Sequence, residues 1–177
     1  MSPTLVASSP AAVTNNLARG VWFDGNRYRS RAHTETLLYS VDLTENVLAL
    51  DNPLLRDYCS DRRVVLFVSG SIDRLYGDAI RRYMDTRRGS KPWSIVVLAT
   101  GEENKTLANA ERVCRAAKHA EIDRRGVLIA VGGGIICDIV GFAAAIYARG
   151  IRYIKLNTTL VGQIDCGVGI KCLSRKG

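Results

Sequence analysis

The sequence predicts an α/β fold, with an open, mostly parallel sheet flanked by helices. Three continuous apolar runs carry this prediction: VVLFVS (64–69), SIVVLA (94–99) and VLIAV (127–131). A strand covered on both faces typically has such a composition. Segments with helical spacing separate the runs, and strands that alternate with helices over short connections build a parallel sheet with packed helices.

The chain begins with a segment of different composition. Residues 1–34 are rich in Ser, Ala, Pro, Asn and Arg and contain one acid, Asp24. No apolar core follows a basic start, so this segment is not a secretory signal. We expect a disordered extension here, with a transit peptide as the alternative. The α/β domain is expected over residues 35–171, followed by a divergent tail at 172–177.

Within the domain, each element follows from its local pattern. TLLYSVDL (36–43) and ENVLAL (45–50) are partly alternating and predict strands, and Asn52-Pro53 then ends the pattern. Apolar residues at helical spacing predict helices over 73–87, where Leu75, Tyr76, Ile80 and Met84 recur, and over 106–119. A nearly uncharged helix follows Gly132-Gly133-Gly134, and RYIKL (152–156) predicts the last strand.

Composition excludes several classes of protein. The net charge is +8, but the arginines come as scattered doublets without an aromatic-interleaved basic stripe, so no nucleic-acid partner is expected. A solvated basic surface or attraction for a small anionic ligand remains. No run of 18 apolar residues predicts a membrane span. The five cysteines form no CxxC pair, which fits a reducing, cytoplasmic compartment.

The glycine turn is the first candidate site. In an open parallel sheet, ligands bind beyond the carboxyl ends of the strands, and glycines there let the backbone approach a pyrophosphate. The spacing is not that of the dinucleotide fingerprint, whose last glycine would fall on Cys137. A tight connection without a ligand is the alternative.

The helix after the glycines carries two charges. Asp138 and Arg149 are eleven residues apart, so on a continuous α-helix they lie within about 20° of each other around the axis. A buried acid needs a partner, because an isolated charge is costly to desolvate. Asp138 could interact with the helix dipole and Arg149 could extend to solvent, or both could line a cleft.

Further polar residues follow the same strands. Thr158 and Thr159 come directly after RYIKL and either cap a helix or contact a ligand. Asp165 and Lys171 flank the apolar segment CGVGI, and Glu102 and Lys105 lie in the loop after the second covered strand. That loop belongs to the same sheet edge as the glycine turn.

In this order and spacing, GEENK (101–105), GGGIICDIVGFAAAIYARGIRYI (132–154) and NTTLVGQIDCGVGIK (157–171) closely resemble the sugar phosphate cyclases, the family of 3-dehydroquinate synthase. The resemblance covers roughly residues 64–171. It implies a Rossmann-like NAD-binding half of a larger enzyme. The GVGIK ending is more similar to the sedoheptulose 7-phosphate cyclases, which make valiolone-type or deoxygadusol-type carbocycles.

The resemblance implies a reaction and a set of contacts. NAD oxidises one hydroxyl of a sugar phosphate, phosphate is eliminated, the ketone is reduced again, and the opened ring recloses in an aldol-type step. The implied NAD contacts are Glu102, Lys105, Gly133, Gly134, Asp138, Thr158 and Thr159. Arg149, Asp165 and Lys171 are the implied contacts to the substrate. The family also implies a homodimer and a divalent metal, zinc or cobalt.

The sequence departs from the family in three places. Ser69 stands where the family often has an acid that holds the adenine ribose, and Asn157 replaces a frequent proline. The resemblance ends at Cys172, before the helical domain that supplies the metal ligands. His33 and His119 cannot be assigned as ligands, so no metal site and no complete catalytic set is expected in this chain.

Three functions therefore remain open. The chain is the NAD-binding half of a sugar phosphate cyclase, inactive alone, with 3-dehydroquinate synthase as the alternative member. It could instead be a truncated, non-catalytic homologue that binds nucleotide or a partner. A relative of NAD-dependent polyol dehydrogenases is the third hypothesis. We expect that the 177-residue chain neither turns over sugar phosphate nor binds a stoichiometric divalent metal.

Overall fold

A computed structural model describes residues 4–9, 20–24, 27–31, 38–86 and 91–159. Its elements, in chain order, are β1 (Thr4–Ser9), β2 (Gly20–Asp24), β3 (Arg27–Arg31), β4 (Leu38–Leu43), α1 (Leu54–Cys59), β5 (Val64–Ser69), α2 (Gly70–Asp85), β6 (Trp93–Leu98), η1 (Glu102–Asn104), α3 (Leu107–His119), β7 (Val127–Gly132), α4 (Gly134–Ile146), η2 (Tyr147–Arg149) and β8 (Arg152–Asn157).

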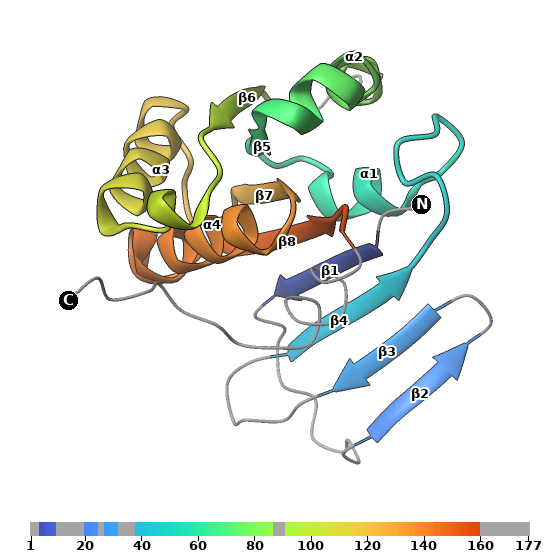
Figure 1. The fold of residues 1–177 in the computed structure, drawn as a ribbon. Helices are drawn as coiled ribbons and strands as arrows, with labels where there is room; N and C mark the ends of the chain where they lie inside the picture. Colours follow the sequence, from blue (N-terminus) through green and yellow to red (C-terminus); the bar gives the residue numbers. More distant parts are fainter. Residues whose placement is uncertain (1–3, 10–19, 25–26, 32–37, 87–90, 160–177) are drawn as a thin grey trace.

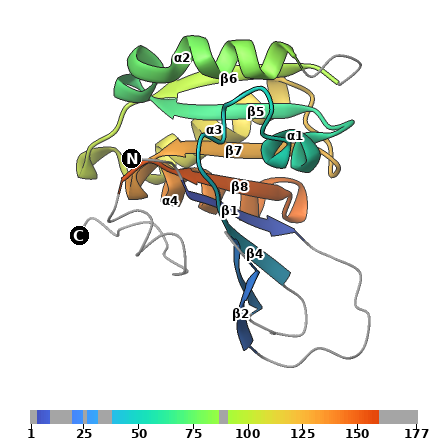
Figure 2. The ribbon, with the colours of Figure 1, turned by 90° about the vertical axis from the view of Figure 1, so that its right-hand side faces the viewer.

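The main sheet has six strands in the order β4-β1-β8-β7-β5-β6 (Figure 1). The four strands from β8 to β6 pair in parallel. β1 lies antiparallel between β4 and β8. β2 and β3 form a separate antiparallel pair, and Figure 2 shows β2 standing away from the helices. The predicted fold class, an open and mostly parallel sheet with helices, is confirmed.

Helices cover both faces of the parallel part. On β5, Leu66 packs in one core with α1 and α2, whereas Phe67 packs in the other core with α3 and α4. Every residue of β5 and of β7 is buried. The continuous apolar runs have this composition because neither face of these strands meets water.

Two segments differ from the sequence-based expectation. Residues 4–9, 20–24 and 27–31 are strands, although a disordered extension was expected over 1–34. ENVLAL was predicted as a strand but forms turns, in which the Ala49 N–H donates to the Asn46 carbonyl over 2.7 Å. Val47 is nevertheless 1% exposed. The apolar pattern of ENVLAL therefore indicates contact with the core and not a strand.

The segment after this turn was not assigned an element from the sequence. It contains α1, whose buried Leu54, Leu55 and Cys59 pack against the sheet. The Tyr58 hydroxyl donates to an Asp42 carboxylate oxygen over 2.8 Å and so ties α1 to β4. The helix is only six residues long, too short for a periodic pattern to identify it.

Candidate functional site

The carboxyl ends of β5, β7 and β8 meet at one edge of the sheet. Gly132 pairs with Asn157, and the Thr158 N–H donates to the Gly132 carbonyl over 3.0 Å. Ser69 ends β5 next to them, because a Cβ atom on Gly132 would lie 3.9 Å from its Oγ. The glycine turn, the two threonines and Ser69 are therefore neighbours, as expected from a parallel sheet.

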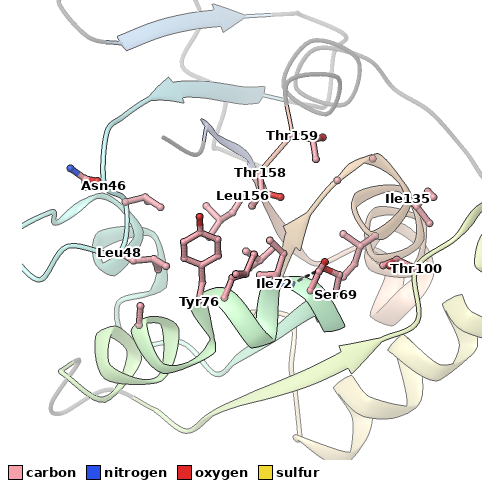
Figure 3. Close-up of a pocket in the computed structure, with 18 of the residues that line it drawn as sticks. Asn46, Leu48, Ser69, Ile72, Tyr76, Thr100, Ile135, Leu156, Thr158 and Thr159 are labelled. Carbon is pink, nitrogen blue, oxygen red and sulfur yellow. Dashed lines mark hydrogen bonds between the residues drawn. The ribbon is translucent and has the colours of Figure 1, made fainter. Parts of the chain in front are cut away.

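A cavity of about 990 Å³ opens at this edge (Figure 3). Its polar lining includes Ser69, Ser71, Thr100, Thr158 and Thr159, together with the backbone of Gly133 and Gly134. The remaining lining is mostly apolar and comes from α2, α4, the turn at residues 46–49 and the sheet. An apolar cavity with a few convergent polar groups is the usual form of a small-molecule site.

The glycine turn leaves backbone exposed to this cavity. Gly132 has a φ of 156°, and a Cβ there would lie 2.6 Å from Cγ2 of Ile136. α4 begins at Gly134 without a side-chain cap. The N–H groups of the first turn of a helix have no partner within the helix and favour an anion. This end of α4 can therefore receive a phosphate group.

Lys105 and Asp138 form an ion pair of 2.8 Å behind the glycine turn. Their side chains are 13% and 7% exposed, respectively. Lys105 ends the short helix η1, and Asn109 of α3 holds that loop by donating from Nδ2 to the Asn104 carbonyl over 2.7 Å. Asp138 thus has the partner that its burial requires. The pair lies outside the lining of the cavity, and Glu102 is exposed on the same loop.

Arg149 does not lie beside Asp138. α4 ends at Ile146, and Ala148 and Arg149 then adopt positive φ values of 49° and 67°. This turn leads into β8 at the amino edge of the parallel strands, whereas Asp138 lies in the first turns of α4. The expected common face required a continuous helix over 138–149, so that geometry is wrong. Asp165 and Lys171 lie outside the described residues.

Sequence reasoning missed the apolar part of the cavity. Leu75 and Tyr76 of α2 were used only as apolar positions at helical spacing, but they are 73% and 47% exposed and line the cavity. In Figure 3 the Tyr76 ring projects from α2 into the space below Leu156. The pattern held no separate signal, because apolar residues at 72, 75, 76, 79, 80, 83 and 84 have the ordinary spacing of a core-facing helix.

Asn157 is a second residue whose position contributes to the geometry of the site. It is fully buried, and its Oδ1 accepts from Sγ of Cys137 over 3.3 Å. Its Nδ2 finds no acceptor in the structure of the described chain. This amide occupies the end of β8, so Asn157 holds the first turn of α4 against the strand.

Neither a metal site nor a membrane span emerges from the part of the chain that the structure describes. Across the described ranges, no three His, Cys, Asp or Glu side chains gather in a group that could hold a metal ion. Among the same residues, no helix has the length and apolar character needed to cross a membrane.

Comparison with known proteins identifies the family. Residues 95–173 match the family model "3-dehydroquinate synthase N-terminal". The chain is 59% identical over 133 residues to a 2-epi-5-epi-valiolone synthase of Streptomyces glaucescens, a match that covers 75% of this chain and 34% of the relative. The chain belongs to the sugar phosphate cyclase family.

Solved members of this family share the fold. A 2-epi-5-epi-valiolone synthase of Streptomyces hygroscopicus subsp. jinggangensis 5008, with NAD⁺ and Zn²⁺ bound, superposes with a TM-score of 0.63 at 31% identity. A 2-deoxy-scyllo-inosose synthase complexed with carbaglucose-6-phosphate, NAD⁺ and Co²⁺ gives 0.59 at 26%. The matches cover 70% and 69% of this chain but 34% and 32% of those chains. This chain therefore corresponds to about a third of a cyclase.

Proposed function

We propose that this chain is the NAD-binding unit of a sugar phosphate cyclase. One observation carries the proposal: the 990 Å³ cavity lies at the carboxyl edge of the parallel strands, with the glycine turn and the two threonines in its lining. NAD⁺ is bound in both solved relatives. The resemblance that named Glu102, Lys105 and Asp138 as cofactor contacts supports extending the site to the buried ion pair beside the cavity.

The residues present fit a dinucleotide. A Cβ atom on Gly133 would point into open space, with only the Thr159 side chain at 3.5 Å, so backbone without a side chain borders the cavity there. We assign the pyrophosphate to Gly133, Gly134 and the first turn of α4, and hydrogen bonds to the cofactor to Thr158 and Thr159. When bound, NAD supplies reversible oxidation of a substrate hydroxyl. The Lys105–Asp138 pair fixes the loop after β6 against α4 beside that cofactor.

The assignment of a substrate is more specific than that of the cofactor, and it rests on the relatives. We propose sedoheptulose 7-phosphate as the substrate of the whole enzyme and a valiolone-type carbocycle as its product, in the cytoplasm and as a homodimer. Arg149, Asp165 and Lys171 would contact this anionic sugar. Among the described residues Arg149 does not reach the cavity, so its role rests on the resemblance. A divalent metal would need ligands beyond the group of residues that the structure describes.

Two alternatives share the same fold. A 3-dehydroquinate synthase is favoured by the name of the matching family model, and assays of the whole enzyme with each sugar phosphate would separate the two. A non-catalytic binding protein is the second alternative. Phosphate release from sedoheptulose 7-phosphate by the 177-residue chain alone would exclude it and would overturn our expectation that this chain is inactive by itself.

The cofactor proposal is tested by replacing Gly133 with alanine. Gly133 has an ordinary φ of −84°, and its new Cβ would make only normal contacts, so Gly133→Ala should keep the melting temperature of the chain. The methyl group would stand between the backbone and the pyrophosphate. We expect NAD affinity, measured by titration calorimetry on the full chain, to fall by about tenfold or more.

The control for an added methyl group outside the cavity lining is Gly77→Ala on α2, which should leave NAD affinity unchanged. Its Cβ would displace the flexible ends of Asp73 and Arg81, so its melting temperature is measured alongside. NAD should also raise the melting temperature of the unaltered chain, because a ligand that binds only the folded state stabilises it. A folded chain that gives neither heat nor stabilisation with NAD would overturn the proposed function.

A further inference from the structure

Arginines gather where the parallel strands begin, at the edge of the sheet opposite to the cavity. The segments that lead into or open β5, β7 and β8 are residues 61–63, 121–125 and 149–152 (Figure 2). Together they contain six arginines and three carboxylates. This edge lies about 20 Å from the glycine turn, because the strand β7 rises by roughly 3.3 Å per residue between them. The surplus of positive charge is therefore outside the proposed cofactor site.

Two of the three carboxylates at this edge already have partners. Glu121 forms an ion pair of 2.9 Å with Arg63, which also donates to a carbonyl just past the end of α3 over 3.5 Å. The carboxylate of Asp123 accepts from the backbone N–H of Arg125 over 2.8 Å and holds the turn before β7. Asp61 is exposed and forms no ion pair with a described residue. The other five arginines of these segments thus have no ion-pair partner within the described chain.

Two of these five guanidiniums are brought together by the sheet. Val127 of β7 pairs with Val64 of β5 on one side and with Arg152 of β8 on the other. Arg62 extends along this edge, and its Nη1 donates to the Arg125 carbonyl before β7 over 2.9 Å. Burial of Arg152 and the nearby Arg62 guanidinium both lower the pKa of Arg152. Two half-buried positive charges therefore lie near each other at the start of β7.

Backbone contacts fix the positions of both arginines. The Arg62 N–H donates to the Cys59 carbonyl at the end of α1 over 3.3 Å. The Ile151 N–H donates to the Ala144 carbonyl over 3.0 Å, which anchors the start of β8 to α4. A guanidinium has five N–H donors, of which Arg62 uses one on a described acceptor and Arg152 uses none. Most of these donors can therefore bind an anion.

The chemistry of the pair indicates which anion it would bind. Two like charges repel each other, and an anion between them turns the repulsion into attraction. A guanidinium binds phosphate through two parallel hydrogen bonds, and a phosphate dianion balances both charges, which one carboxylate does not. We propose that Arg62 and Arg152 bind a phosphate dianion at the amino edge of the sheet, as the free ion or as the phosphate group of a monoester. The proposed cofactor site is not involved.

Phosphate titration of the full chain tests this site. Thermal unfolding is compared in inorganic phosphate and in chloride at equal ionic strength, with and without saturating NAD, which would occupy the cofactor cavity. Phosphate should raise the melting temperature by several degrees above chloride in both cases, because a ligand that binds only the folded state stabilises it. A larger rise with glycerol 3-phosphate would identify a monoester as the preferred source of the phosphate, and a smaller rise would identify the free ion.

Substitution of the two arginines locates the effect. Arg152→Gln and Arg62→Gln should each weaken phosphate binding, measured by calorimetry, by about tenfold. In phosphate-free buffer of low ionic strength, Arg152→Gln should melt no lower than the unaltered chain, because it relieves the repulsion. Arg115→Gln is the control, since it removes the same charge from an exposed position on α3 and should keep the phosphate affinity.

Two results would overturn the phosphate site. One is a melting temperature that phosphate raises no more than chloride does. The other is equal phosphate affinity in Arg152→Gln and in the unaltered chain, which would place the anion elsewhere. A chain that fails to bind NAD but shows the arginine-dependent phosphate effect would overturn the proposed function and support this site.

Discussion

At the scale of single residues, the Lys105–Asp138 ion pair is the charged contact of the described site that is largely buried. Both side chains are largely removed from water, so each charge depends on the other for its solvation. Asp138→Asn should lower the free energy of unfolding by about 3 kcal/mol, because Lys105 loses its counter-charge. Urea unfolding of the full chain measures this change.

The exposed pair Arg115–Glu111 serves as the control. Its N–O distance of 2.7 Å is similar, but the side chains are 77% and 61% exposed. Glu111→Gln should change the free energy of unfolding by less than about 1 kcal/mol. Equal effects of the two substitutions would show that the burial of Lys105 and Asp138 adds nothing to their interaction.

The sequence could show that Asp138 needs a partner, because a buried acid beside Ile136, Ile139 and Val140 cannot remain alone. It could not show that α4 ends at Ile146. Tyr147 and Ala148 separate Arg149 from the helix, and both Ala148 and Arg149 have positive φ values. Neither alanine nor arginine is a residue type that predicts this backbone conformation. The helical wheel therefore placed Arg149 wrongly.

At the scale of elements, Tyr83 joins α2 to the segment before β5. Its hydroxyl donates to the Asn52 carbonyl over 2.9 Å and accepts from the Arg56 N–H over 3.0 Å. Tyr83→Phe should lower the free energy of unfolding by about 1–3 kcal/mol, since the Asn52 carbonyl and the Arg56 N–H both lose the buried hydroxyl as a partner. Thermal and urea unfolding near neutral pH would measure the loss.

Alkaline pH gives the same contact a second readout. Burial raises the pKa of Tyr83, against a smaller lowering by its contact with Arg56. A raised pKa in the folded state means that stability is complete below the unfolded value of about 10 and is lost as pH rises through the folded pKa. Tyr83→Phe should lose less stability than the unaltered chain over this range. An identical decline in both proteins would contradict the assignment.

Most of the elements around the site could be predicted from the sequence. The apolar runs predicted β5, β6 and β7 to within a residue or two, and β5 and β7 are buried on both faces, which tolerate few polar residues. The expectation that β6 is covered in the same way is wrong, because this edge strand is mostly half-buried. ENVLAL failed because its buried valine sits on a turn stabilised by local hydrogen bonds, including the bond from Nδ2 of Asn52 to the Glu45 carbonyl. An apolar residue indicates that its side chain is buried, and a side chain can be buried on a turn as well as on a strand.

At the scale of the whole molecule, the position of β1 could not be derived from its own residues. Thr4–Ser9 contains three hydroxyl residues and one alanine, a composition also typical of disordered segments. Its strand depends on two partners distant in the sequence, β4 and β8. Without β1, the backbone of β8 would be left unpaired on one side, at an edge beside the candidate site.

Removal of residues 1–10 tests whether β1 is integral to the sheet. Six residues of β1 pair with β4 and five with β8, so the deletion should lower the melting temperature and expose the amides of β8 to hydrogen exchange. Val6→Pro should act similarly without shortening the chain, because proline removes an N–H within the ladder. Trp22→Pro disrupts only the separate β2–β3 pair and should leave the β8 amides protected. Unchanged protection of β8 after both β1 alterations would mean that residues 4–9 are dispensable, as a disordered extension would be.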